Sequence, residues 1–221
     1  MMRNVTRGAK PGSLQRNAGM WTRELLAARR QRNLDPKRLG ALFDRYNCAD
    51  VRDALDKMYS GLCCYCEAEI GIVAFDHIEH RKPKRLFPRY CFDWRNLHLG
   101  CPKCNQAKGE KWVRRNPILD SVADVPIENH LTYDVRDVLG VIRCATTARG
   151  RTTVDHADLD RDKLRAARTK VAFGVWGVIA ELNRAPNSPR ASQLRRELEE
   201  KTKGSFGSLV RWQCKTYLKA A

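Results

Sequence analysis

The sequence predicts an α+β fold that is mostly helical, with a short core framed by N-terminal and C-terminal helices. Apolar residues recur at helical spacing before residue 60 and again after residue 158. Between residues 62 and 100 this period is lost, and two cysteine pairs bracket the segment. The chain carries no clean linker, so we expect one compact domain with three parts, residues 1–60, 61–120 and 121–221.

The composition indicates an anionic partner. The 221 residues include 42 lysines and arginines against 25 acidic residues, a formal charge of +17. Nucleic acid is the commonest partner of such a chain, and a charge that serves solubility alone is the alternative. No apolar run of about 18 residues is present, and the basic start lacks the apolar region of a secretory signal. We therefore expect a cytoplasmic protein without a membrane helix.

The N-terminal part is predicted to contain an extended arm and three helices. Residues 1–20 contain several glycines and few apolar side chains, which indicates an arm. Residues 21–32 form the first expected helix. A second helix begins at Asp35, with a proline in its first turn, and a third runs from Asp50 to a stop at Gly61.

The C-terminal part is predicted to contain a small hairpin and three helices. Residues 142–146 form one expected strand, residues 149–151 its turn and residues 152–154 the partner strand. Three helices with apolar residues every three or four positions follow: from Asp158 to the residue before Pro186, over residues 189–202, and from Ser205 onward.

Four of the nine cysteines form two CxxC pairs, Cys63 with Cys66 and Cys101 with Cys104. Two such pairs supply the four thiolates of a tetrahedral zinc site, with iron as a lesser alternative. The spacing leaves Cys64 outside this set. Clustered pairs in a cytosolic chain indicate metal rather than disulfides, so we expect structural zinc that stabilises a segment with little core of its own.

Between the cysteine pairs, two histidines each follow a carboxylate: Asp76 precedes His77, and Glu79 precedes His80. A one-metal phosphodiesterase needs a base to deprotonate water and a hard cation to hold the scissile phosphate. A histidine beside a carboxylate supplies both. For either pair alone a structural histidine is the default. Between two metal knuckles in a basic chain, we favour the catalytic interpretation.

The sequence resembles the HNH endonuclease, or ββα-metal, family in three stretches, residues 79–83, 96–97 and 101–109. The resemblance implies that His80, which Pro83 follows at the family's spacing, is the general base. It also implies that Glu79 and Asn105 hold a catalytic Mg²⁺ or Mn²⁺, although Glu79 stands where the family usually has aspartate. Asn96 matches a residue that usually holds the loop between the strands. The predicted fold is therefore a zinc-stapled ββα-metal core framed by helices.

Other polar residues of this segment are open to several interpretations. Three interpretations of His77 stay open: it contacts a metal ligand without binding the ion, it is a metal ligand itself, or it is a core histidine. We expect His98 to be structural. Lys108, one turn after Asn105, either contacts phosphate or lies on a plain helix surface. Cations in the loop after the first strand are candidates for phosphate contact, with a solvated loop as the alternative: Lys82, Lys84, Arg85 and Arg89.

Residues 61–67, 92–97 and 116–120 further resemble the HNH component of the Septu antiphage system and its retron-associated relatives. This resemblance implies an ABC-type ATPase partner similar to PtuA and a role in phage defence, and a homodimer or larger complex is compatible with the sequence. The main hypothesis is a metal-dependent endonuclease, with DNA favoured as substrate. Two alternatives stay open: a zinc-stapled nucleic-acid-binding module without catalysis, and an interaction subunit that is silent until assembled.

Overall fold

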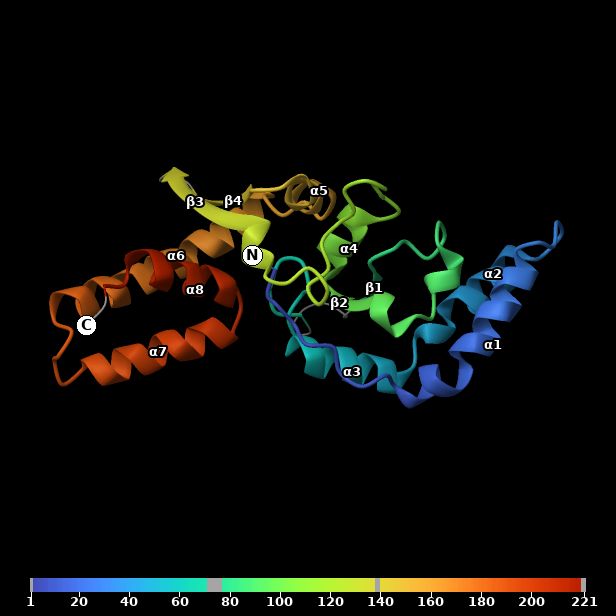
Figure 1. The fold of residues 1–221 in the computed structure, drawn as a ribbon, viewed down its shortest axis with the longest axis horizontal. Coiled ribbons are helices and arrows are strands. Elements are labelled where there is room, and N and C mark those ends of the chain that lie inside the picture. Colours follow the sequence, from blue (N-terminus) through green and yellow to red (C-terminus); the bar gives the residue numbers. More distant parts are fainter. Residues whose placement is uncertain (1, 71–76, 138–139, 220–221) are drawn as a thin grey trace.

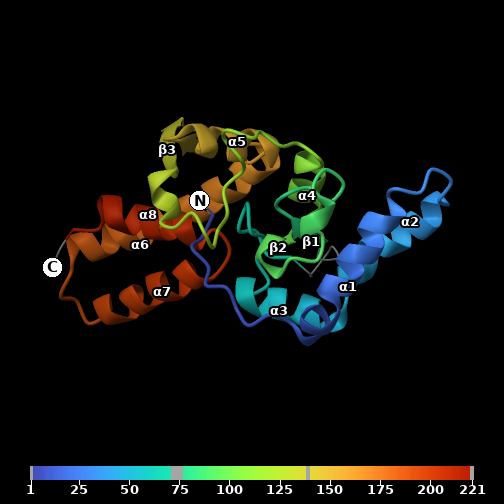
Figure 2. The same cartoon turned by 45° about the vertical axis from the view of Figure 1, so that its right-hand side comes forward.

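Helices at both ends of the chain frame a small antiparallel sheet (Figure 1), in a computed structural model that describes residues 2–70, 77–137 and 140–219. The first helices lie at one end of the elongated molecule and the last three at the other (Figure 2). The sheet and the short helix that follows it lie between them. This arrangement confirms the predicted α+β, mostly helical fold with a central core.

Three helices form the N-terminal region: α1 (Gly12–Ala28), α2 (Pro36–Phe43) and α3 (Ala49–Tyr59). Because α1 begins at residue 12, the expectation of an extended arm through residue 20 is wrong. Leu14 and Leu25 are fully buried on one face of α1, and this burial outweighs the low helix propensity of its glycines. The Ser13 backbone N–H and hydroxyl both donate to Asp50 at 2.8 Å, which fastens the start of α1 to α3.

The expected boundaries of α2 and α3 are close to those observed. Asp35 accepts a hydrogen bond from the Lys37 backbone N–H at 3.1 Å, and Pro36 occupies the first turn of α2. Helix α3 ends where Ser60 and then Gly61 take left-handed φ angles of 53° and 71°. Since glycine adopts this conformation without a steric penalty, Gly61 turns the chain from α3 toward the first cysteine pair.

The central region is a ββα unit. Strand β1 (His77–His80) pairs antiparallel with β2 (Leu97–Gly100), and α4 (Pro102–Lys108) follows directly. Strand β2 begins at Leu97 because Trp94–Asn96 forms a 3₁₀ turn before it. Helix α4 ends at Lys108. Residues 71–76 lie outside the described residues, and the carboxylate considered from the sequence at Asp76 lies with them.

A hairpin is present, but its position differs from the prediction. It consists of β3 (Leu131–Asp137) and β4 (Gly140–Ala145), and α5 (Ala148–His156) replaces the predicted turn and second strand. The Thr147 hydroxyl accepts a hydrogen bond from the Gly150 N–H at 3.1 Å and caps α5. Gly150 serves packing rather than a turn, since a Cβ there would lie 2.2 Å from the carbonyl oxygen of His130.

The C-terminal region consists of α6 (Asp162–Arg184), α7 (Ala191–Lys203) and α8 (Gly207–Tyr217), which confirms the three predicted helices. The main apolar core joins α1 and α3 to the cysteine pairs, and a second cluster lies among α6, α7 and α8. Helix α8 begins two residues after the predicted start at Ser205 and has no side-chain cap. Instead Phe206 precedes α8 with a φ of 56°, and the Ser205 hydroxyl accepts from the Glu69 N–H at 3.2 Å. Among the helices that the structure describes, none has the length and apolar character needed to cross a bilayer.

Candidate metal centre and active site

The four predicted metal ligands lie together. The sulfur atoms of Cys63, Cys66, Cys101 and Cys104 all fall within 4.8 Å of one another, and Cys66 Sγ lies 3.9 Å from Cys101 Sγ. A tetrahedral zinc ion with zinc–sulfur bonds of about 2.3 Å separates its thiolates by about 3.8 Å, so this group fits zinc. Cys64 stands outside the group, as its spacing predicts, and its backbone N–H donates to β2.

Polar donors orient these sulfur atoms. The Cys101 N–H donates to Cys63 Sγ at 3.3 Å, and the Cys104 N–H donates to Cys101 Sγ at 3.4 Å. Hydrogen bonds from the other three thiols lower the pKa of Cys101, which favours a thiolate there. Arg161, directly before α6, places Nη1 3.5 Å from Cys104 Sγ and offsets negative charge. Sequence reasoning missed Arg161 because no local pattern relates it to a cysteine 57 residues away.

His80 is held at the end of β1 as a neutral imidazole. It is 6% exposed, and its Nε2 lies 2.9 Å from the carbonyl oxygen of Cys91. A carbonyl oxygen only accepts hydrogen bonds, so Nε2 carries the proton and Nδ1 keeps its lone pair. The Tyr46 ring packs edge-on against the imidazole, with ring centroids 4.5 Å apart. Burial lowers the pKa of His80 to about 3, which keeps the ring neutral at physiological pH.

Glu79 lies on the opposite face of β1 and is buried against α4. Its Oε1 accepts from Lys108 Nζ at 2.5 Å and from the Tyr65 hydroxyl at 3.0 Å. Burial raises the pKa of Glu79, an effect that Lys108 and Tyr65 partly offset. Both side-chain contacts go to one carboxylate oxygen. Among the described residues, no side chain bonds Oε2.

Lys108 is an interior residue rather than the helix-surface lysine considered from the sequence. Its side chain is 1% exposed, and besides Glu79 it donates to the main-chain carbonyl oxygen of His80 at 2.7 Å. The ammonium therefore joins α4 to the strand that carries both candidate residues. It also neutralises a carboxylate whose charge would be costly to bury alone.

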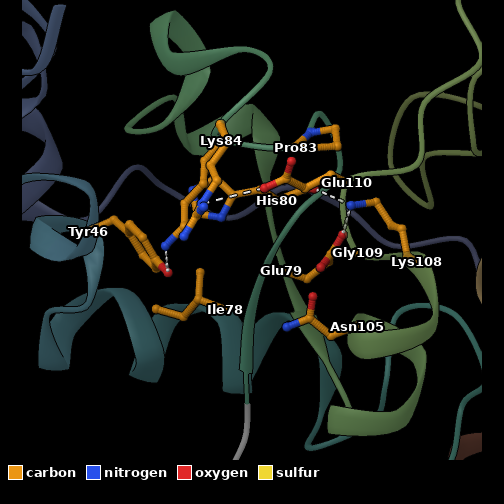
Figure 3. A pocket seen from close by; sticks show the side chains of 11 residues that line it. Tyr46, Ile78, Glu79, His80, Pro83, Lys84, Asn105, Lys108, Gly109 and Glu110 are labelled. Atoms are coloured by element: carbon orange, nitrogen blue, oxygen red, sulfur yellow. Dashed lines mark hydrogen bonds and ion pairs between the residues drawn. The ribbon is translucent and has the colours of Figure 1, made fainter. Parts of the chain in front are cut away.

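A cavity of about 220 Å³ opens beside β1, α4 and the loop that follows β1 (Figure 3). Glu79 and His80 reach it from β1 and Asn105 from α4, so the residues matched to the base and the metal ligands share one space. Asn105 Nδ2 lies 3.2 Å from His77 Nδ1, which leaves Asn105 Oδ1 for a hard cation. The cavity is lined by Tyr46, Ile78, Glu79, His80, Pro83, Lys84, Arg85, Asn105, Lys108, Gly109 and Glu110.

Two of the candidate residues, Asn96 and His77, do not line this cavity. Asn96 is buried and holds the loop after β1. Its Oδ1 accepts from the Lys82 N–H at 2.7 Å, and its Nδ2 donates to the carbonyl oxygens of Lys82 and Tyr90 at 3.0 Å. His77 is exposed beside Asn105, so its position fits a residue that orients Asn105.

His98 has the buried surroundings of a structural histidine. Its Nδ1 lies 2.6 Å from the Tyr59 hydroxyl, and its Nε2 lies 4.0 Å from Asp120 Oδ1. Burial lowers the pKa of His98 to about 3, so the ring is neutral. These contacts tie β2 to α3 and lie apart from the cavity, which fits the role expected from the sequence.

Lys84 and Tyr46 form one wall of the cavity. Lys84 Nζ donates to Asp44 Oδ1 at 2.8 Å. It also donates to the Tyr46 hydroxyl at 2.9 Å (Figure 3). The Tyr46 ring meanwhile contacts His80. No local sequence pattern marks Tyr46 as a cavity residue. Only the long-range packing of the 3₁₀ turn Asp44–Tyr46 against the loop after β1 brings the tyrosine to the cavity.

The remaining loop cations differ in how accessible they are. Lys82 Nζ lies 3.9 Å from the Tyr90 ring centroid, a cation–π contact. Arg85 is 74% exposed and lies 3.5 Å from Glu110, and Arg89 is exposed. A pair between exposed side chains is weak, so Arg85 and Arg89 remain accessible to phosphate while Lys82 and Lys84 are engaged within the protein.

The segment that holds this site matches a known protein family. Residues 63–111 match the model of the HNH endonuclease family. The match includes the four cysteines, the ββα unit and the cavity residues Glu79, His80 and Asn105. The resemblance predicted from the sequence is therefore confirmed.

The chain is also similar to two proteins named Septu protein PtuB. It is 30% identical over 112 residues to the protein of Bacillus thuringiensis, and this alignment covers 50% of this chain and 41% of that protein. It is 28% identical over 161 residues to the protein of Bacillus mycoides strain KBAB4, and this alignment covers 59% of this chain and 53% of that protein. The chain thus spans about half the length of the curated relatives it matches. No solved structure matches it.

Proposed function

We propose that the chain is a metal-dependent HNH endonuclease that hydrolyses phosphodiester bonds of nucleic acid, with DNA favoured over RNA. The observation that carries the proposal is the state of His80. Its Nε2 proton is directed at the Cys91 carbonyl oxygen, and its Nδ1 lone pair remains available in the cavity that Glu79 and Asn105 share. An anionic phosphate in that cavity favours the imidazolium form of His80. Bound substrate therefore raises the pKa of His80, which burial alone lowers.

The reaction we propose is in-line hydrolysis. His80 Nδ1 takes a proton from water as the water oxygen attacks phosphorus, and the opposite P–O bond breaks. The leaving alkoxide takes a proton from solvent water and departs as an alcohol. Glu79 Oε2 and Asn105 Oδ1 are hard oxygen ligands that would hold Mg²⁺ or Mn²⁺. Such an ion, when bound, stabilises negative charge on the phosphate and on the leaving oxygen.

Three other residues support this site by position. Lys108 holds α4 against β1 through Glu79 and the His80 carbonyl oxygen. Asn96 donates to the carbonyl oxygen of Tyr90 and so fixes the turn at that residue. The carbonyl oxygen of the next residue, Cys91, bonds His80 Nε2 and orients the imidazole. His77 would orient Asn105 through its Nδ1. The four-cysteine group would hold structural zinc at the N-terminal end of α4, where Cys101 and Cys104 lie.

We further propose a role in antiphage defence. The similarity to two Septu PtuB proteins supports this role. The resemblance in sequence also implies an ABC-type ATPase similar to PtuA as partner. Co-expression with such an ATPase, followed by purification through a tag on the ATPase alone, tests the partnership: the chain is expected to co-purify in a fixed ratio.

The nuclease proposal is tested on supercoiled plasmid, linear DNA and RNA with Mg²⁺ or Mn²⁺, with and without the ATPase. His80→Gln keeps an amide donor for the Cys91 carbonyl and removes the base, so we expect cleavage to fall by at least about 100-fold. His156→Ala, on α5 outside the cavity, is the matched control and is expected to cleave normally. Cleavage by a folded His80→Gln protein at the wild-type rate would overturn the mechanism.

A further inference from the structure

The connection between α1 and α2 carries a concentrated positive charge. We call residues 29–38 the hairpin tip. It contains five cations against one acid, and all six side chains are exposed. The cations are Arg29, Arg30, Arg32, Lys37 and Arg38. The acid is Asp35, whose carboxylate accepts from a backbone N–H and caps α2.

These five cations lack the ion pairs that some other exposed cations of the chain form. Over the residues that the structure describes, none of the five lies in a salt bridge. On α7, by contrast, Lys201 lies 3.5 Å from Glu197, and Lys203 lies 2.7 Å from Glu200. Around the cavity, Lys84 and Lys108 are also paired. Five like charges on one short connection repel one another, and a polyanion seated on them would relieve that repulsion.

The hairpin tip is rigidly linked to the cavity. Helix α2 leads directly into the 3₁₀ turn Asp44–Tyr46, whose tyrosine lines the cavity. Arg45 of that turn forms an ion pair with Glu24 of α1. The Trp21 ring of α1 packs edge-on against Phe92 of the loop after β1, with ring centroids 5.5 Å apart. A macromolecule bound at the cavity and at the tip would therefore meet one fixed surface.

The direction and length of the hairpin suit an extended partner. Helices α1 and α2 project from the central region toward one end of the molecule, with their connection at its extremity (Figures 1 and 2). The tip joins the cavity through α2, whose eight residues span about 12 Å, since an α-helix rises 1.5 Å per residue. That length corresponds to about three to four base pairs of a duplex with a rise of 3.4 Å. The tip is thus placed to touch a duplex a few base pairs away from the cleaved bond.

We propose that the hairpin tip binds the phosphate backbone of a nucleic-acid duplex whose scissile phosphate lies in the cavity. This inference rests on the proposed nuclease function and adds a second contact site to it. Arginine and lysine side chains meet phosphates without reading base sequence, so the contact adds affinity and salt dependence rather than sequence specificity. The tip also offers exposed cations to the phosphates, whereas Lys82, Lys84 and Lys108 contact other groups within the protein.

The test is the salt dependence of binding. A variant with all five tip cations changed to glutamine is compared with wild type on a labelled duplex of about 30 base pairs, in a His80→Gln background that prevents cleavage. Each lost phosphate contact reduces the magnitude of the slope of log K against log salt by about 0.9, so the loss of five contacts should reduce it by about 4.5. The matched control changes five exposed cations of the C-terminal region to glutamine: Arg184, Arg190, Arg196, Lys201 and Lys203.

The outcomes separate this proposal from the nuclease proposal. A tip variant with a slope within about one unit of wild type overturns it, as does a control variant that loses as much slope. If the tip variant loses binding to vesicles of phosphatidylcholine and phosphatidylserine but binds duplex normally, the surface serves a membrane and the proposal is wrong. If His80→Gln cleaves like wild type while the slope falls as expected, the nuclease mechanism fails and the duplex contact stands.

Discussion

The ββα region between residues 63 and 111 buries charged and polar side chains, whereas the cluster among α6, α7 and α8 is apolar. The buried polar residues of the first region are Glu67, Glu79, His80, Asn96, His98 and Lys108. The second cluster consists of Val175, Ile179, Leu182, Ala191, Leu194, Leu198 and Val210. A buried polar group needs its partner in place, while an apolar side chain needs only matching volume.

The comparison shows how the two regions depend on their contacts. In the ββα region a few directional contacts and a proposed metal ion hold two strands and a seven-residue helix. In the apolar cluster among α6, α7 and α8 the contacts are interchangeable in kind, although α6 and α8 also bury Arg168 and Gln213 outside it. Where the two regions meet, the buried Glu67 accepts from the Ser208 N–H at 3.0 Å and from its hydroxyl at 2.5 Å. A change in the metal-stapled segment is therefore expected to reach α8 through this carboxylate.

Removal of one cysteine ligand is expected to have the largest effect. Structural zinc binding contributes roughly 10 kcal/mol or more to folding, so Cys104→Ser or a strong chelator should unfold the ββα region. Hydrogen exchange would show loss of amide protection across residues 63–111, with slower loss in α6 and α7. Cys214→Ser, outside the group, is the control and should keep both zinc and protection. Unchanged protection after zinc removal would contradict this expectation.

Loss of the buried ion pair comes next. Lys108→Met leaves Glu79 without its partner ammonium, which we expect to destabilise the protein by about 3–5 kcal/mol in chemical denaturation. The double variant Lys108→Met with Glu79→Gln removes the uncompensated charge and should recover part of that loss. A single variant within about 1 kcal/mol of wild type would show that Glu79 does not depend on Lys108 for its charge.

An apolar truncation in the C-terminal cluster tests the other side of the comparison. Leu194 is 2% exposed, and Leu194→Ala should cost about 3 kcal/mol through lost burial and a residual cavity. Leu194→Met, which preserves volume, should cost less than about 1.5 kcal/mol. Zinc content and hydrogen exchange over residues 63–111 should not change in either variant below its melting temperature. A loss of zinc would mean that the regions are more tightly coupled than the comparison implies.

The parts of the fold that the sequence predicts are those with local signals. The CxxC pairs identify the candidate metal ligands because each pair places two thiols close together on a short turn. The helices after residue 158 follow from apolar spacing, and α2 follows from Asp35 and Pro36. The hairpin was misplaced because Arg149-Gly150-Arg151 looks like a turn locally. The close approach of Gly150 to His130, which explains the glycine, is a tertiary contact.

The candidate site shows the same division. The spacing of Pro83 after His80 identifies the candidate base, but not that the Cys91 carbonyl oxygen fixes its tautomer. Lys108 appears on a helix after a metal knuckle, and periodicity alone gives no reason to bury it. Its partner Glu79 lies on another element, and only folding brings the two charges together. Local patterns therefore predict which residues matter, while their contacts depend on chain segments far apart in sequence.

The smallest predicted effect concerns a pair that joins the loop after the ββα region to α5. Burial alone would raise the pKa of Asp124, but hydrogen bonds from Arg149 and from the Asp120 N–H outweigh it, so the pKa lies below its usual value. A carboxyl whose folded pKa is depressed stabilises the protein fully above its unfolded pKa of about 3.9, and that contribution is lost as pH falls through the folded value. The contribution should be about 1 kcal/mol or less, since the pair is partly exposed.

Denaturation from pH 7 down to acid pH would measure this contribution. The difference in unfolding free energy between wild type and Asp124→Asn should be constant at neutral pH and should shrink below about pH 4, where the unfolded chain binds its proton first. Asp162→Asn is the matched control, because its side chain is 92% exposed and pairs with Arg165 only across one helix turn. That control should show a small difference at every pH. A difference for Asp124→Asn that persists into acid would mean that its carboxylate stabilises the loop by packing rather than by its charge.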